Sequence, residues 1–334
     1  MKIIIDAMSG DKAPEEIVKG AVMARRELGV DVILVGKKEV VDSILAKEGC
    51  TDIEVVDARD IITMEDDPST ATRRKKEASM TVALNLLRDG QGDALVSAGS
   101  TGALLTGATL IVKRINGIRR AALSPVLPNG GAGTLLMDSG ANVECTPEYL
   151  LQFAYMGSFY AKKMMGLENP RVGLANVGTE DTKGGPLQHE AFRLLKEAGE
   201  AGRINFIGNV EGNNVFAGDV DVIVTDGFTG NMMLKTAESM IKFMMGKLKG
   251  VFYKSLKNKL AAAVLKGDLE QMKKMLDVKE VGGTIMLGIS APVIKAHGSS
   301  DARSILAAAR QAKTCVESGI IDDIKANIEY MKIG

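Results

Sequence analysis

The chain has no excess of charge, few cysteines and no long apolar run, and each shortage excludes a class of protein. Its 42 basic residues balance 42 acidic residues, so no global field attracts nucleic acid. Cys50, Cys145 and Cys315 are widely spaced, which excludes a disulfide framework and a zinc spacing and predicts a cytoplasmic protein. Asp6 interrupts the apolar start of the chain, and no apolar run approaches the roughly 18 residues of a membrane span. We therefore expect a soluble protein, or one that lies on a membrane surface.

Several signatures of well-known enzymes are also missing. The segment 99–102 matches neither the Walker spacing nor G-x-G-x-x-G, which disfavours nucleotide binding. The chain contains no G-x-S-x-G nucleophile elbow and no H-E-x-x-H metal motif. Of the two histidines, His189 lies in a polar helical stretch and is expected at the surface.

What the chain does have is a recurring turn, in which a short apolar run ends at small polar residues and a glycine. The six turns fall within residues 3–11, 94–102, 135–140, 172–181, 222–231 and 292–301. Apolar runs that alternate with helix-length segments are typical of strands buried in a parallel sheet. Ligands bind beyond the carboxyl ends of such strands. The pattern therefore predicts an anion-binding site at one edge of one sheet.

The same pattern predicts one α/β/α domain over residues 1–334. We expect strands near 2–6, 31–35, 53–57, 94–98, 121–127, 133–138, 171–176, 204–208, 222–225 and 292–296. Helices are expected at 15–28, 79–87 and 147–165, the last with Thr146 at its N-cap and Pro147 in its first turn. Strands 121–127 and 133–138 turn through Pro128-Asn129-Gly130-Gly131 and are expected to form a hairpin.

A lysine-rich segment stands apart in composition. Residues 239–267 contain seven lysines and no acidic residue, interleaved with apolar side chains. We interpret the region 232–276 as a protruding hairpin of two helices joined near residues 250–254. It is either a dimerisation element with solvated lysines or a basic amphipathic element that rests on anionic lipid, and the two are compatible. The membrane or dimer contact is assigned to Lys259, Leu260, Val264, Leu265 and Lys266.

Two strand-end loops offer anion ligands. Ser100, Thr101 and Gly102 can hold a phosphate at the start of a helix, although a glycine pair at such a turn is often only tight packing. Lys183 follows Asn176 and Asp181 in a second loop. It can bind phosphate or neutralise an oxyanion, or be simply solvated.

The last two turns carry an amide and an imidazole. Asn231 is either a helix cap or an amide donor to a substrate oxygen. His297 has polar neighbours and is either part of a hydrogen-bond network or a proton-transfer group. Asp6, Asp11 and Asp226 could bind a metal or serve as helix caps, and we expect no metal and no cofactor.

A basic run, Arg73 to Lys76, follows an acidic turn. Such a run is usually a solvated turn, but it can also bind an acidic partner or a phosphodiester.

Six segments together carry a resemblance. They are Asp6–Pro14, Arg73–Lys76, Ser97–Ala103, Asn176–Asp181, Val224–Asn231 and Ala291–Asp301. In this order they resemble the bacterial phosphate acyltransferases, which convert acyl-carrier-protein thioesters to acyl phosphates. The match spans nearly the whole chain. Ser9, Ser100 and Ser139 depart from the family pattern.

The resemblance implies a three-layer, Rossmann-like, mostly parallel sheet, like those of phosphate acetyltransferases and isopropylmalate dehydrogenases. It also implies a homodimer at the inner face of the cell membrane, acting at the start of phospholipid synthesis. The implied partners are acyl carrier protein, inorganic phosphate and a downstream glycerol-3-phosphate acyltransferase that uses the acyl phosphate. Arg73, Arg74, Lys75 and Lys76 would dock the carrier protein.

The expected reaction is direct attack of phosphate on the thioester carbonyl. We assign Lys183 to stabilise the oxyanion, Asn231 to donate from its amide, and His297 to assist the leaving thiolate. The expected substrate- or phosphate-binding residues are Asp6, Ser100, Thr101, Gly102, Asn176, Asp181, Asp226, Thr229, Gly230, Lys295, Ser299 and Asp301.

Two other functions stay open. A dehydrogenase of the isopropylmalate type needs metal-binding aspartates and an arginine group, and the strand-end loops offer no arginine of their own. A non-catalytic membrane-surface scaffold would account for the hairpin and leave the polar loops unexplained.

Overall fold

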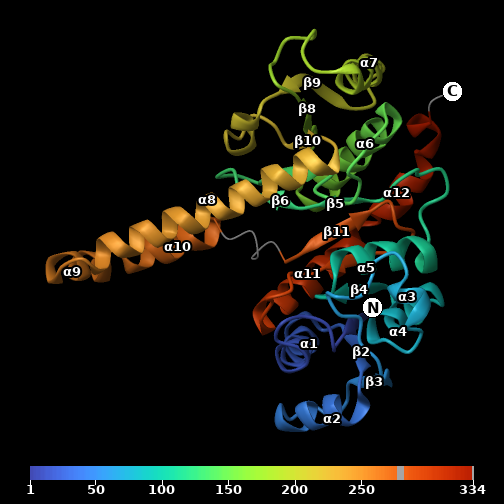
Figure 1. Cartoon of the computed structure of the whole chain (residues 1–334), viewed down its shortest axis with the longest axis vertical. Coiled ribbons are helices and arrows are strands. Elements are labelled where there is room, and N and C mark those ends of the chain that lie inside the picture. Colours follow the sequence, from blue (N-terminus) through green and yellow to red (C-terminus); the bar gives the residue numbers. More distant parts are fainter. Residues whose placement is uncertain (277–281, 333–334) are drawn as a thin grey trace.

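The computed structural model describes residues 1–276 and 282–332 and contains two mostly parallel sheets with helices around them (Figure 1). The larger sheet has seven strands, and β11 is antiparallel to both of its neighbours. Its strands, in spatial order, are β3 (Glu54–Asp57), β2 (Asp31–Gly36), β1 (Lys2–Asp6), β4 (Ala94–Ser97), β12 (Val293–Lys295), β11 (Thr284–Leu287) and β5 (Ala122–Ser124). Because β1, β4 and β12 are parallel neighbours, their carboxyl ends meet at one edge.

The smaller sheet has five strands, of which β7, β10 and β8 are parallel neighbours. In spatial order they are β6 (Val126–Leu127), β7 (Thr134–Met137), β10 (Val222–Val224), β8 (Arg171–Ala175) and β9 (Asn205–Val210). The carboxyl ends of these three central strands therefore also share an edge.

Helices cover both faces of the larger sheet, which confirms the expected α/β class. Along β1, Ile3 and Ile5 belong to the core that also contains Ile305 of α11, whereas Ile4 packs in a second core with Leu84 of α4. This alternation is the period of two of a strand buried on both faces. The helices of the body are α1 (Glu15–Leu28), α2 (Lys38–Lys47), α3 (Ala71–Arg74), α4 (Ser79–Arg88), α5 (Thr101–Gly107), α6 (Pro147–Met164), α7 (Pro186–Glu200), α11 (Ala302–Ser318) and α12 (Ile320–Ala326).

The helix predicted at 15–28 is confirmed at both ends, and those predicted at 79–87 and 147–165 are confirmed to within one residue. Thr146 stands at the N-cap of α6 but makes no capping bond with its side chain. A π-helix (Ala108–Val112) continues α5, and two 3₁₀ turns lie at Gly212–Phe216 and Ile328–Met331.

The expectation of a single sheet is wrong, and Pro125 lies at the point where the sheets divide. The strand predicted at 121–127 is two strands, because β5 pairs with β11 in the larger sheet while β6 pairs with β7 in the smaller one. Proline has no N–H to donate to a ladder and interrupts strands. The predicted hairpin itself is confirmed, with Leu127 opposite Thr134. The short antiparallel strand β11 was not predicted.

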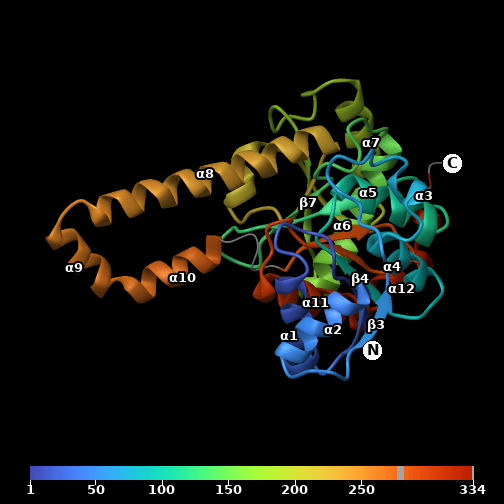
Figure 2. The same cartoon turned by 60° about the horizontal axis from the view of Figure 1, so that its bottom comes forward.

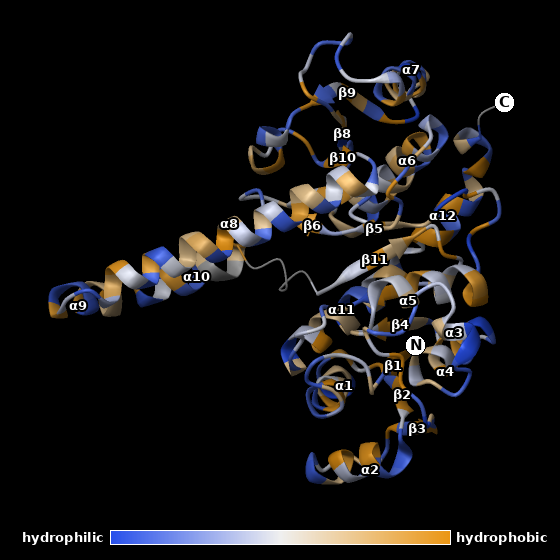
Figure 3. Ribbon diagram, in the orientation of Figure 1, coloured by the Kyte–Doolittle hydropathy of each residue, from blue (hydrophilic) through white to orange (hydrophobic). Residues whose placement is uncertain are grey.

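The lysine-rich segment forms an arm that projects from the body (Figures 1 and 2). It contains three helices where two were expected: α8 (Gly227–Tyr253), α9 (Leu256–Val264) at the tip and α10 (Lys266–Leu276). Hydrophilic and hydrophobic residues alternate along it (Figure 3), and α9 buries none of its residues. Within residues 1–276 and 282–332, no helix is both long and apolar enough to cross a membrane.

Two glycines of α8 offer a matched test of its packing. A Cβ at Gly230 would overlap the carbonyl oxygen of Asp138, whereas a Cβ at Gly246 would meet nothing within 4 Å. We expect Gly230→Ala to lower the free energy of unfolding by about 2–3 kcal/mol through overpacking. Gly246→Ala should raise it by roughly 0.5–1 kcal/mol, because alanine loses less backbone entropy on folding.

Urea unfolding followed by circular dichroism measures both changes. Equal stability of the two variants would contradict the close approach of α8 to the loop after β7.

Candidate functional site

Three loops meet at the carboxyl edge of the larger sheet. Asp6 ends β1 fully buried, and the Ser97 hydroxyl at the end of β4 donates a hydrogen bond of 2.7 Å to its carboxylate. The Gly99 N–H donates to the same hydroxyl at 3.2 Å. The Asp11 N–H donates to the carbonyl of Gly298, 2.8 Å away, which ties the β1 loop to the β12 loop.

The facing edge of the smaller sheet is built around a buried carboxylate. Asp138, directly after β7, accepts hydrogen bonds from the N–H groups of Leu123 and Asn142, at 2.8 and 2.7 Å. Burial raises the pKa of Asp138, while these donors act in the opposite direction. Because Leu123 belongs to β5, this carboxylate joins the edges of the two sheets.

Three predicted site residues serve as helix caps. Ser100 accepts a hydrogen bond from the Ala103 N–H at the start of α5. Asp226 accepts from the N–H and the hydroxyl of Thr229, each at 2.8 Å, and caps α8. Asp301 accepts from the Ser304 N–H at 3.0 Å, which lowers the pKa of Asp301. Asp226 rather than Asn231 caps α8, so the cap interpretation of Asn231 is wrong.

A cavity of about 710 Å³ lies between the two edges and the inner part of α8. Its polar lining combines groups from both sheets and from α8, namely Thr101, Ser139, Asn231, Lys235, Glu238, Lys242, Thr284, Lys295, His297, Ser299, Ser300 and Ser304. Its apolar lining is Leu123, Pro125, Val126, Leu234, Ile241, Met245, Leu276 and Ala296. The volume falls within the roughly 300–1,000 Å³ of small-molecule sites.

The cavity brings together five of the predicted site residues: Thr101, Asn231, Lys295, His297 and Ser299. Asn231 comes from α8, and its side chain lies 3.6 Å from the position that a Cβ would take on Gly140. The other four come from the loops of the larger sheet. The five residues thus come from three of the predicted turns, those within 94–102, 222–231 and 292–301, and these turns belong to two sheets instead of one.

Lys295 is the cation most withdrawn from water in this cavity. Burial lowers the pKa of Lys295 to about 8, the charge of Asp11 opposes this effect, and the charge of Lys235 adds to it. The ammonium group donates to the neighbouring carbonyl of Ala296. A desolvated cation of this kind gains most from an anionic ligand.

His297 is oriented by Ser299. The Ser299 N–H donates to Nδ1 of His297 at 3.2 Å, and the Ser299 hydroxyl lies 2.9 Å from the same nitrogen. A donor on Nδ1 favours the tautomer that carries its proton on Nε2.

Lys183 does not line this cavity. Its side chain is 47 % exposed and its ammonium group lies 3.8 Å from the Glu180 carboxylate. The loop is fastened to the body at two points, since the Asn176 amide donates to the Lys183 carbonyl at 3.0 Å and the Asn209 amide donates to the Glu180 carbonyl at 2.9 Å. The role assigned to Lys183 stays a prediction.

The remaining predicted substrate-binding residues are not among those that line the cavity. They are Asp6, Ser100, Gly102, Asn176, Asp181, Asp226, Thr229, Gly230 and Asp301. Conversely, Lys235, Glu238 and Lys242 line the cavity but were not predicted as site residues. Their spacing of three and four residues along α8 places them on one face with Asn231, and this period was the available signal.

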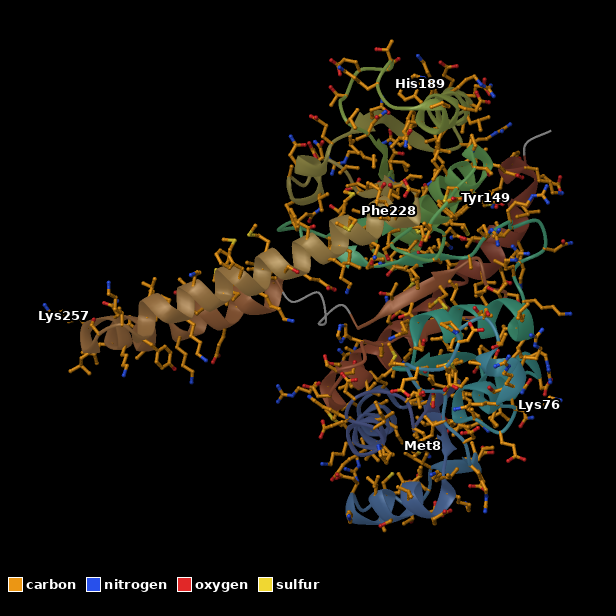
Figure 4. All side chains as sticks on the ribbon, viewed as in Figure 1. Met8, Lys76, Tyr149, His189, Phe228 and Lys257 are labelled. Atoms are coloured by element: carbon orange, nitrogen blue, oxygen red, sulfur yellow. The ribbon has the colours of Figure 1, made fainter. Side chains whose placement is uncertain are left out.

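The other groups considered from the sequence are the candidate metal ligands and the basic run. Among the residues that the structure describes, no three His, Cys, Asp or Glu side chains gather as a metal site. In the basic run, Arg73, Arg74 and Lys76 are exposed, whereas Lys75 is paired with Asp66 at 2.9 Å. Figure 4 shows Lys76 on the body and Lys257 at the outer end of the arm, with Phe228 at its inner end.

The chain shares the α/β fold of solved phosphotransacetylases. The phosphotransacetylase of Streptococcus pyogenes aligns with a TM-score of 0.63 at 20% identity, covering 94% of each chain. The EutD phosphotransacetylase of Staphylococcus aureus aligns with a TM-score of 0.62 at 17% identity, over 95% of this chain and 94% of that one. At these identities the likeness shows the fold alone.

The family follows from the sequence match. A family model described as "Fatty acid synthesis protein" matches residues 1–323. The phosphate acyltransferase of Oceanobacillus iheyensis is 47% identical over 330 residues, covering 98% of both chains. That of Clostridium acetobutylicum is 44% identical over 334 residues, covering 99% of this chain and all of the relative. The chain belongs to the fatty acid synthesis protein family, and the resemblance to phosphate acyltransferases is confirmed.

The lowered pKa of Lys295 leads to a prediction about stability. The pKa of Lys295 is lowered in the folded state, so the unfolded chain binds the proton more tightly between about pH 8 and 10.5. Folding with Lys295 protonated therefore costs most free energy below pH 8. This cost falls, and the stability of the protein rises, as the pH increases through that window. We expect Lys295→Met to raise the free energy of unfolding at pH 7 by about 2 kcal/mol, with the difference shrinking towards pH 10.

Urea titrations at pH 7 and pH 10 measure this difference. Lys183→Met is the matched control and should change stability by less than about 0.5 kcal/mol, because Lys183 is exposed. An equal effect of the two substitutions at pH 7 would contradict the desolvation of Lys295.

Proposed function

We propose that this protein transfers the acyl group of an acyl-carrier-protein thioester to inorganic phosphate. The products are acyl phosphate and free carrier protein, and the reaction serves phospholipid synthesis. The observation that carries the proposal is a desolvated lysine, Lys295, beside Asn231 and His297 in one cavity. The chain matches phosphate acyltransferases over nearly their whole length, and this match supports the transfer of an acyl group to phosphate.

The reaction needs positioning more than proton transfer. A phosphate oxygen attacks the thioester carbonyl carbon, and the carbonyl electrons move onto its oxygen as an oxyanion. The oxyanion then collapses, the carbon–sulfur bond breaks, and the thiolate leaves and takes up a proton. Phosphate is already an anionic nucleophile at neutral pH, so the main tasks are to hold it and to stabilise the oxyanion.

The cavity assigns these tasks to its own residues. Lys295 holds the phosphate by charge and stabilises the oxyanion, and Asn231 of α8 donates from its amide to phosphate or to the oxyanion. His297 donates from Nε2 to the departing sulfur, which needs little assistance because a thiolate is a good leaving group. Thr101 and Ser299 add hydroxyl donors at the same end of the cavity.

Lys183 can reach the reacting atoms only if its loop moves or if a second copy supplies it. We therefore assign oxyanion stabilisation first to Lys295 and treat Lys183 as an auxiliary cation. The neighbouring predicted residues act indirectly, as Asp226 does in capping the helix that carries Asn231.

The alternatives have less support. No arginine stands among the residues that line the cavity in the described part of the chain, as a dicarboxylate-binding dehydrogenase would need. A scaffold that only binds membranes does not account for a desolvated lysine inside a cavity.

The arm supports a homodimer at the inner face of the cell membrane. On α9, Leu256, Leu260 and Val264 lie four residues apart and are 75, 63 and 85% exposed. Lysines flank this stripe, and anionic lipid attracts each by about 1 kcal/mol. Along α8, Phe228, Met240, Phe243 and Met244 are also exposed, a surface that a second copy would cover.

The remaining partners follow from the reaction. The acyl carrier protein would dock through Arg73, Arg74 and Lys76, which are exposed. Acyl phosphate is a reactive anhydride, so a membrane-bound glycerol-3-phosphate acyltransferase is a suitable consumer. The link through Pro125 and the Asp138 carboxylate supports treating residues 1–334 as one acyltransferase domain.

Release of free thiol tests the reaction and the lysine assignment together. With acyl-carrier-protein thioester and no nicotinamide, we expect thiol release that depends on phosphate. Lys295→Ala should lower kcat/KM by roughly 10²–10³, the usual loss for one oxyanion donor. Lys183→Ala should lower it less than tenfold. A larger loss for Lys183 than for Lys295 would overturn our assignment, and release that is independent of phosphate would overturn the reaction.

Vesicle binding tests the arm. Leu260→Glu with Val264→Glu should abolish binding to anionic vesicles in a flotation assay, because both charges fall on the apolar stripe of α9. Activity on soluble carrier protein should remain. Ala261→Glu with Gly250→Glu adds the same charge at exposed positions off the stripe and is the control. Binding that survives the first pair would mean that the stripe is a contact between copies.

A further inference from the structure

The cavity has two ends of different chemistry. At one end lie Lys295, His297 and Asn231, where the proposed reaction takes place. At the other end lie Ile241 and Met245 of α8 and Leu276, the last residue of α10. The second end has no evident task in positioning phosphate, because it is apolar and belongs to the arm.

One face of α8 forms the wall that joins the two ends. Residues 231, 234, 235, 238, 241, 242 and 245 follow the three- and four-residue spacing of a single helix face, and all line the cavity. Leu234, Ile241 and Met245 form an apolar stripe on it. Ile241 and Met245 are half-buried, whereas their neighbours Met240 and Met244 are 53 and 62% exposed.

The opposite wall is apolar as well. Leu123, Pro125 and Val126 come from the segment that passes between the two sheets. The charged members of the α8 face do not contradict an apolar ligand, because Lys235 is paired with Glu238 at 2.9 Å and Lys242 is exposed to solvent. Their aliphatic stems can cover a chain while the charges stay hydrated.

We propose that this cavity binds the acyl chain of the thioester. The carbonyl lies near Asn231 and Lys295, and the chain runs along α8 with its methyl end at Met245 and Leu276. This inference rests on the proposed function and adds to it the residues that select chain length.

Two measures of the cavity agree on the length of chain. Fourteen residues separate Asn231 from Met245, which is about 21 Å of helix. A saturated chain advances about 1.25 Å per carbon, so this distance fits about sixteen carbons. If each methylene takes roughly the 30 Å³ of a water molecule, such a chain fills about 500 Å³. The cavity of about 710 Å³ then leaves room for the thioester and phosphate.

Because the chain runs along α8, each position on this helix face corresponds to a certain number of carbons from the thioester. Ile241 is four residues, or about 6 Å, nearer to the reacting end than Met245. A bulky side chain at position 241 should therefore exclude about five more carbons than the same side chain at position 245.

The experiment compares Ile241→Trp, Met245→Trp and the control Lys247→Trp, with phosphate and acyl-carrier-protein thioesters of about eight to eighteen carbons. Lys247 is exposed on the opposite face of α8. For the unaltered protein, kcat/KM should rise about fourfold per buried methylene up to about sixteen carbons. We expect Met245→Trp to shift the preferred length down, Ile241→Trp to shift it by about five carbons more, and Lys247→Trp to leave it unchanged.

The contrary outcomes are distinct. A uniform loss at every chain length in both cavity variants would mean that this wall binds the pantetheine arm or another shared part of the donor, and would overturn the proposal. An unaltered protein that releases no thiol from any of the thioesters would overturn the proposed function itself.

Activity on the shortest thioester shows whether the tryptophan variants fold. If they do not, Ile241→Ala and Met245→Ala replace them. Both alanine variants should lower kcat/KM for the sixteen-carbon thioester by roughly tenfold. Met245→Ala should leave kcat/KM for the eight-carbon thioester unchanged. Equal losses at both lengths for Met245→Ala would also overturn the proposal.

Discussion

The proposed site depends on one constraint, the partial burial of the Lys295 ammonium group at the end of β12. Its pKa falls to about 8 because burial penalises the charge, and Asp11 compensates only in part. The protein thus keeps a cation in a place that costs folding free energy. In the proposed reaction, an oxyanion in the cavity would replace part of the solvation that burial removes from this ammonium group, so the same group would bind the anion and stabilise the developing negative charge.

The two-sheet architecture explains how this cation comes to face its partners. Parallel strands end together, so each sheet gathers its polar loops at one edge. Pro125 separates β5 from β6 and lets one segment belong to both sheets, while the Asp138 carboxylate joins the loop after β7 to β5. The helix that starts beside this junction carries Asn231 into the cavity and then continues into the arm. The polar lining residue Asn231, the apolar lining residues of α8 and the outer tip of the arm are therefore successive parts of one helical segment.

Much of this could be predicted from local sequence, and the rest could not for a physical reason. The turns that contain Thr101, Asn231, Lys295 and His297 indicate strand ends in the sequence, and all four residues line the same cavity. Which strand ends face one another depends on long-range pairing, so the division at Pro125 and the short strand β11 were not foreseen. Lys183 illustrates the same limit: its loop has the right composition, yet Asn176 and Asn209 fasten it outside the cavity. The three- and four-residue spacing of α8 would have allowed its inward face to be predicted. The residues of the opposite cavity wall, Leu123, Pro125 and Val126, could not be predicted in this way.

A crystal structure with phosphate and a non-hydrolysable acyl thioether bound tests the account most directly. We predict phosphate within hydrogen-bonding distance of Lys295 Nζ and of the Asn231 amide, with the acyl carbonyl carbon beside it, between the edges of the two sheets. Phosphate bound at the Lys183 loop, with Lys295 making no contact to either ligand, would contradict the account.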